Sequence, residues 1–192
     1  MKVCVKLVLA FLACMALLVG CAAKKADAAQ QCAADFLVCY YSYNKDGRYD
    51  TLTAEIAEAE EQFEASQPEP GIHFNESIEQ AIDQYYQELA ALAEETLLDS
   101  MQANQLTYKE EAVYAEAQRS CEVAEVAFDE PAADGTRSFT LTLKVSDAQN
   151  VQEQTITGDI RCTMENEAYQ VSYFHERTRT PTAAKMLEEP TA

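Results

Sequence analysis

Cysteine, histidine and serine side chains are the groups of this chain best suited to chemistry, and their spacing decides which chemistry is open to them. There are two histidines, His73 and His175, and seven cysteines. The sequence has no C-x₂-C pair for zinc, no G-x-S-x-G turn for a serine nucleophile and no glycine-rich phosphate or dinucleotide fingerprint. We therefore expect no metal site and no cofactor.

The first 21 residues have the layout of a secretory signal. Lys2 and Lys6 precede an apolar run of 14 residues from Leu7 to Gly20, and Cys21 follows. As a helix this run would cover roughly 21 Å, against about 30 Å for the hydrocarbon core of a bilayer. It is therefore too short to remain as a membrane-spanning anchor.

The end of this stretch, Leu18-Val19-Gly20-Cys21, resembles the lipobox of bacterial lipoproteins. The resemblance implies that residues 1–20 are a signal peptide removed by a peptidase, and that Cys21 carries a diacylglyceryl group and often a third acyl chain. Two or more chains hold a protein stably on a membrane. The protein is then expected on the extracytoplasmic face of a bacterial cell membrane, tethered through residues 21–27. A plain secretory signal with an incidental cysteine is the alternative.

The mature chain is strongly acidic. Removing residues 1–20 takes away Lys2 and Lys6 and no acidic residue, so the net charge changes from −19 to −21. A surface of this sign repels the phosphates of nucleic acids and of anionic lipids. We therefore expect no nucleic-acid partner, and we expect contact with the membrane through the lipid anchor.

Four cysteines remain between the tether and the end of the chain: Cys32, Cys39, Cys121 and Cys162. Outside the cytoplasm they could form disulfides, and four thiols allow three pairings. In a helix, Cys32 and Cys39 would lie roughly 10.5 Å apart along the axis, beyond the limit of about 7 Å between bridged Cα atoms. Either a bridge joins a helix cysteine to a strand cysteine, or all four stay reduced on apolar faces, where burial raises the thiol pKa.

Helical periodicity dominates the first half of the mature chain, and alternation dominates the second half. We predict helices over residues 28–43 and 51–66, a long helix from Ser77 that Asn104-Gln105 interrupts, and a helix over 107–117. Four strands follow, the first over 119–129 with a bulge near Ala124-Glu125. The inward faces are expected to carry the residues Phe139, Leu141, Leu143 and Val145, then Ile156, Ile160, Cys162 and Met164, then Tyr169, Val171 and Tyr173.

These elements predict a single α+β domain over residues 28–178, with a flexible tail over 179–192. Its N-terminal helices should pack on one face of a curved four-stranded antiparallel meander. The element order and the turn Asp46-Gly47-Arg48-Tyr49-Asp50 resemble small lipoproteins of the nuclear-transport-factor-two-like (cone) superfamily. The last strand departs from that pattern, since Tyr173 stands where many such domains have tryptophan.

The cone resemblance implies a pocket between the sheet and the helices. In enzymes of this superfamily an acid, a histidine or a tyrosine faces the pocket, which makes His175, Asp35 and Tyr40 the catalytic candidates here. We expect binding rather than catalysis: a membrane-anchored, non-enzymatic domain for a small ligand or an envelope protein. The alternatives are a cone-fold enzyme that uses a pocket histidine and acid pair, and a structural envelope component.

Overall fold

The computed structural model describes residues 27–45, 47–66 and 75–179. The predicted signal peptide, the lipidation site Cys21 and most of the predicted tail lie outside these residues, as does His73. None of the helices in the described ranges has the length and hydrophobicity needed to span a bilayer.

Six helices precede the strands in the described part of the chain. They are α2 (Ala28–Tyr41), α3 (Arg48–Ser66), α4 (Glu76–Tyr85), α5 (Gln87–Ala90), α6 (Glu95–Asn104) and α7 (Leu106–Glu116). Asp27 begins α2, because its carboxylate accepts a hydrogen bond of 2.7 Å from the Gln30 amide. Asn75 begins α4 in the same way, with bonds from the amides of Ser77 and Ile78, so the predicted start at Ser77 is two residues late.

The long helix predicted from Ser77 is wrong, because the chain leaves the helix around Ala93 to pair with the sheet. The Val171 amide donates to the Leu92 carbonyl at 2.7 Å, and the Glu94 amide donates to the Val171 carbonyl at 3.0 Å. These bonds replace helical ones and separate α5 from α6. The predicted interruption at Asn104-Gln105 is confirmed, since Gln105 has a left-handed backbone with φ 53°.

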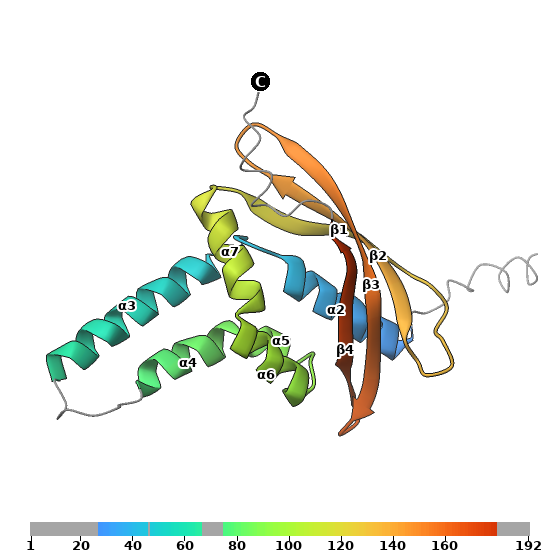
Figure 1. Cartoon of the computed structure of the whole chain (residues 1–192), viewed down its shortest axis with the longest axis horizontal. Coiled ribbons are helices and arrows are strands. Elements are labelled where there is room, and N and C mark those ends of the chain that lie inside the picture. The colour runs from blue at the N-terminus through green and yellow to red at the C-terminus, as the bar shows by residue number, and fades with distance from the viewer. Residues whose placement is uncertain (1–26, 46, 67–74, 180–192) are drawn as a thin grey trace, which may run out of the picture.

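The four strands form an antiparallel sheet in the order of the sequence. They are β1 (Ser120–Phe128), β2 (Arg137–Ser146), β3 (Val151–Glu165) and β4 (Ala168–Arg179). The predicted α+β class and meander are confirmed, and the bulge in the first strand lies between Val123 and Glu125 as expected. Figure 1 shows α3 and α4 as a hairpin that extends away from the sheet, with α5, α6 and α7 between them and the sheet. The curvature of the sheet stays a prediction.

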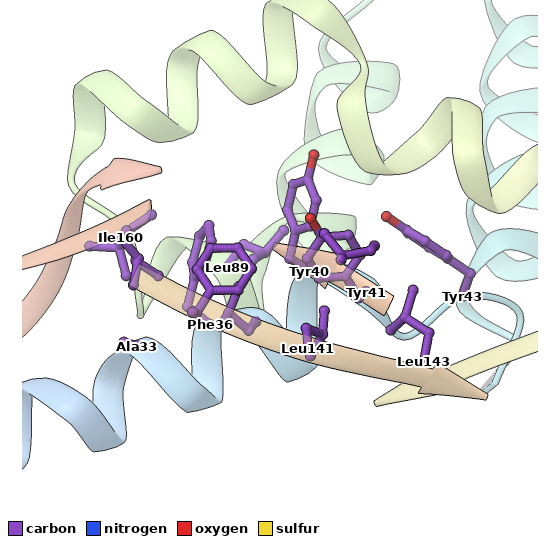
Figure 2. Packing of buried hydrophobic residues seen from close by; sticks show 14 of the residues in the cluster. Ala33, Phe36, Tyr40, Tyr41, Tyr43, Leu89, Leu141, Leu143 and Ile160 are labelled. Carbon is purple, nitrogen blue, oxygen red and sulfur yellow. The ribbon is translucent and has the colours of Figure 1, made fainter. Parts of the chain in front are cut away.

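The core lies between α2 and the inner face of the sheet. Phe36 and Tyr41 of α2 are fully buried, and the predicted inward residues of β2 are buried opposite them (Figure 2). Gly158 of β3 faces Phe139 of β2 in the strand register. A Cβ atom at Gly158 would come within 2.5 Å of the Phe139 ring, so glycine is required for this aromatic side chain to lie across β3.

The predicted inward face of β4 is wrong after Val171. The β3–β4 register shifts between Arg161 and Cys162, so β4 carries one extra residue, Ser172, and the alternation reverses beyond it. Phe174 therefore joins the core, 5.3 Å from Phe36 between ring centroids, while Tyr173 is 40% exposed. Met164 of β3 was also expected to face inward and is 63% exposed near the β3–β4 turn.

Candidate functional site

The three predicted catalytic residues do not converge. The reversed alternation of β4 makes His175 exposed on the face of the sheet opposite α2, so its predicted inward orientation is wrong. Asp35 is exposed on α2 and accepts a hydrogen bond of 2.8 Å from the Gln31 side chain. Tyr40 is buried against Phe174, with ring centroids 4.9 Å apart. The geometry forms no histidine and acid pair from these residues.

Aromatic side chains occupy the space where the cone resemblance implies a pocket. Phe174 lies at the centre of this group, within 4.9 to 6.3 Å of the rings of Phe36, Tyr40, Tyr41 and Phe139. The Tyr41 hydroxyl donates to a carboxylate oxygen of Glu176 at 2.6 Å. The space around Phe174, between the C-terminal half of α2 and the sheet, is thus filled, and we seek the candidate binding site among the other helices.

A buried carboxylate, Glu111 of α7, organises the place where α3, α4 and α7 meet. It is 0% exposed. It accepts hydrogen bonds from Arg48 Nε at 2.9 and 3.1 Å, from the backbone N–H of Asn44 at 3.1 Å and from the Tyr85 hydroxyl. Arg48 also donates to the Ser42 carbonyl at 2.6 Å. Burying a charge is costly unless it is paired and hydrogen-bonded, and these donors supply that pairing.

The ionisable groups around Glu111 are held in one protonation state at neutral pH. Burial and the neighbouring Glu111 charge raise the pKa of Tyr85 above its usual range, so its phenol remains a donor. Burial raises the pKa of Cys39 from 9.0 to about 11, with Arg48 opposing the shift and Glu88 adding to it. Burial is the largest single influence on the pKa of Arg48 and lowers it, but the charges of Glu111 and Tyr85 and the hydrogen bond to Glu111 together outweigh burial and raise it. The cluster is therefore suited to holding helices in place rather than to moving protons.

One side of the α3–α4 hairpin carries a groove that begins at this cluster. Its inner part has a volume of about 290 Å³ and is lined by Arg48, Tyr85, Glu55 and Glu88 among others. A second hollow of about 260 Å³ shares Glu55, Ala81 and Gln84 and continues along both helices. We call these two hollows together the α3–α4 groove. Carboxylate and amide side chains supply most of its polar lining.

The other side of the hairpin carries a smaller apolar pocket. It has a volume of about 180 Å³, and its lining residues are Leu52, Ile56, Ile82, Tyr86, Gln102, Gln105 and Tyr108. Leu52 lines both this pocket and the groove. The Tyr108 ring contacts Tyr49 and Tyr85, at centroid distances of 5.5 and 6.5 Å. We call this hollow the α4–α6 pocket.

Four tyrosines gather around the end of α2 and the start of α3, and they divide between the core and the site: Tyr40, Tyr41, Tyr43 and Tyr49. Tyr40, Tyr41 and Tyr43 are at most 7% exposed and belong to the core cluster, so they offer no ligand surface. Tyr49 is half-buried next to the α4–α6 pocket through Tyr108. The helix-end cluster is thus mainly a structural feature.

The four cysteines are free thiols at three places in the fold. Cys39 faces Glu88 on the hairpin side of α2, with 3.7 Å between its sulfur and a carboxylate oxygen. Cys121 is fully buried at the start of β1. Cys32 and Cys162 interact with one another where α2 meets β3 and β4. In the described ranges, no group of three or more histidine, cysteine or acidic side chains could hold a metal ion.

Comparisons with known proteins do not assign the chain to a family. No protein-family model matches it, and no curated protein matches it. The functional conclusion therefore rests on the hairpin, its groove and its pocket.

Proposed function

We propose that this protein is a lipid-anchored binding domain on the outside of a bacterial cell membrane, and that it binds a basic segment of an envelope protein at the α3–α4 hairpin. The observation that carries the proposal is one hairpin with two different surfaces, an acidic groove on one side and an apolar pocket on the other. Figure 1 shows this hairpin extending away from the sheet, where a partner has access to it.

The size of the α4–α6 pocket favours a protein partner over a free small ligand. Sites for drug-sized ligands have volumes of about 300–1,000 Å³, whereas this pocket has about 180 Å³. That space suits one apolar side chain of a partner, and a few such buried anchors supply most of the affinity in protein interfaces. The side chains of Tyr86, Gln102 and Gln105 add hydrogen-bonding groups at the same place.

The charge of the protein favours a basic partner. The expected mature chain has a net charge of −21, and Glu55, Glu58 and Glu88 line the α3–α4 groove. Complementary charge speeds the encounter of two proteins and rejects partners of the same sign. Lysine or arginine residues flanking an apolar anchor would meet both surfaces of the hairpin.

The site chemistry supports binding over catalysis. Glu111 is saturated by donors, and the phenol of Tyr85 and the thiol of Cys39 stay protonated at neutral pH because burial raises their pKa values. A general base needs a pKa near the working pH and a free lone pair that faces its substrate. Glu111 has no free lone pair that faces a substrate, and burial holds the pKa values of Tyr85 and Cys39 above the working pH.

The anchor is tested separately from the binding site. In a bacterial host, Cys21→Ser should move the protein from the membrane fraction to a soluble extracytoplasmic fraction, because the acyl chains are lost. Mass spectrometry of the wild-type amino terminus should show acylated Cys21. An unmodified terminus that retains residues 1–20 would refute the lipid anchor and leave the binding proposal to its own test.

The binding site is tested with a fluorescent peptide of alternating lysine and leucine, titrated into the detergent-extracted protein and followed by anisotropy. Gln102→Trp should block the α4–α6 pocket and weaken binding at least about tenfold, or about 1.4 kcal/mol. Ala103→Trp is the matched control, since Ala103 is exposed on the same helix and does not line the pocket.

Three results would contradict the binding site. They are equal affinity in the two tryptophan variants, binding of a control peptide with glutamate in place of lysine, and absence of binding to the wild-type protein. Retained circular dichroism spectra in both variants would show that the helices are intact.

A further inference from the structure

The thiol of Cys32 lies against β4, the edge strand of the sheet, where Val171 pairs with residues 92–94. Cys32 is on the buried face of α2, and its sulfur donates to the Tyr169 carbonyl at 3.1 Å and to the Leu92 carbonyl at 3.8 Å. The Leu92 carbonyl also accepts the Val171 amide at 2.7 Å. The sulfur of Cys32 is therefore held beside residues 169–171 of β4.

Cys162 reaches the same place from β3. It pairs with Val171 in the β3–β4 register, and its even position puts its side chain on the inner face with the buried residues Ile156 and Ile160. Val171, the partner of Cys162, lies beside the sulfur of Cys32, because its amide donates to the same Leu92 carbonyl that the Cys32 thiol approaches. Two thiols from elements far apart in the sequence are thus neighbours in the fold.

We propose that Cys32 and Cys162 form a disulfide that joins α2 to β3. The proposed extracytoplasmic location enters only as the source of an oxidising environment. The other two thiols are excluded by position, since Cys39 contacts Glu88 and Arg48 on the hairpin side of α2 and Cys121 is sealed at the first strand by a backbone bridge to Tyr43. Cys32–Cys162 is therefore the one bridge that we expect among these four cysteines, and Cys39 and Cys121 stay as free thiols.

An open pocket gives an oxidant access to Cys32, the first thiol of this pair. It has a volume of about 860 Å³, begins at Asp27 and Ala28, and is lined by Cys32 together with Gln31 and Tyr169. The oxidant we name is a disulfide, carried by a small molecule or by a protein. The pocket lies at the start of the described chain, immediately after the predicted tether.

The reaction is two successive thiol–disulfide exchanges. The Cys32 thiolate attacks one sulfur of the donor disulfide, forms a mixed disulfide and releases the other donor sulfur as a thiolate. The Cys162 thiolate then attacks the Cys32 sulfur, which releases the second donor thiolate. The donor gains the two electrons that the protein thiols lose, and the two thiol protons end on the donor sulfurs.

The environments of the two thiols set this order. The hydrogen bond from Cys162 lowers the pKa of Cys32 despite burial, which makes Cys32 the readier nucleophile. The hydrogen bond to Cys32, burial and the charge of a Cys32 thiolate all raise the pKa of Cys162. Once Cys32 is in a mixed disulfide its charge is gone, so Cys162 is freed to react second.

The test uses the full mature protein extracted from bacterial membranes and reduced with dithiothreitol. After removal of the reductant, it is incubated with oxidised glutathione, alkylated and digested for mass spectrometry under non-reducing conditions. We expect a peptide pair joined through Cys32 and Cys162, with Cys39 and Cys121 alkylated. In Cys162→Ser we expect at least about tenfold more glutathione adduct on Cys32 than on Cys39, whereas Cys39→Ser should leave the bridge unchanged.

Alkylation of both Cys32 and Cys162 after this treatment would overturn the proposal, and so would a bridge that includes Cys39 or Cys121. A protein that forms the bridge with oxidised glutathione but is fully reduced when trapped directly from cells would support the pair and refute the proposed extracytoplasmic location. The two proposals therefore fail in different measurements.

Discussion

At the scale of single residues, Glu111 has the largest structural consequence. Its carboxylate is enclosed where α3, α4 and α7 meet, and its donors come from two separate parts of the chain: the Asn44 backbone and Arg48 near the start of α3, and Tyr85 at the end of α4. Removing one partner of such a cluster leaves buried groups unsatisfied, which costs more than the net contribution of the intact pair.

Glu111→Ala should destabilise the protein by about 3 kcal/mol, because Arg48 and Tyr85 lose their acceptor inside the protein. The matched control is Glu116→Ala, an exposed acid on the same helix, for which we expect less than about 0.5 kcal/mol. Urea unfolding followed by circular dichroism measures both changes. Equal effects of the two substitutions would mean that the Glu111 cluster does not hold the hairpin.

The thiol of Cys39 makes the free energy of unfolding fall as the pH becomes alkaline. Its thiol has a folded-state pKa of about 11 against 9.0 in the unfolded chain, so the folded state retains a proton that the unfolded state loses. This contribution to stability is fully present below pH 9 and is lost as the pH rises through 11. Melting temperatures between pH 8 and 11 should fall less steeply in Cys39→Ala than in the wild type, and parallel curves would contradict the assignment.

Part of this cluster was predictable from the sequence and part was not. Thr107, Glu111 and Tyr114 are spaced by four and three residues, so a helix over this stretch puts Glu111 on the same face as Tyr114, and all three are buried. The partner Arg48 is the first residue of α3, 63 residues earlier, and helical periodicity carries no information across that distance. The sequence is enough to predict that Glu111 faces the interior, but it does not predict the salt bridge between Glu111 and Arg48.

At the scale of elements, the instructive case is β4. The sequence predicted the strand and the inward position of Val171, but strict alternation fails where Ser172 is inserted into the β3–β4 register. The position of a bulge depends on how two strands pair. Serine is not a residue type that marks bulges, so Ser172 gives no sign of one in the sequence. The same limit explains the long helix expected from Ser77, which breaks because its middle pairs with β4.

Paired substitutions in β4 test this register. Phe174→Ala should cost about 2–4 kcal/mol, because its ring contacts Phe36, Tyr40 and Phe139 in the core. Tyr173→Ala should cost less than about 1 kcal/mol, since Tyr173 is exposed and contacts the Arg161 guanidinium at 5.7 Å. Unfolding free energies in urea measure both, and the opposite ranking would restore the strict alternation that the sequence alone suggests.

At the scale of the whole molecule, the sequence predicted the fold class well because periodicity changes once along the chain, from helical to alternating near Arg119. The alternating residues of β2 are buried as expected because β2 itself has no extra residue: the bulge of the β1–β2 pair lies in β1, and the β2–β3 register is continuous. The arrangement of the helices above the sheet was less predictable, since it depends on contacts such as Leu92–Val171 that join separate elements.

The charge of −19 for the full chain, or −21 after the expected cleavage, also acts on the molecule as a whole. Like charges spread over a folded surface repel one another and destabilise the compact state, and salt screens this repulsion with a Debye length of about 30 Å at 0.01 M and about 3 Å at 1 M. The melting temperature should therefore rise by several degrees as sodium chloride increases over this range.

Buried pairs such as Arg48–Glu111 are screened much less, so their contribution opposes the trend only weakly. Differential scanning calorimetry measures the change, with chloride in place of sulfate because sulfate also strengthens apolar burial. A melting temperature that falls with salt would show that favourable ion pairs outweigh the net repulsion, and that charge alone does not make the hairpin attractive to a basic partner.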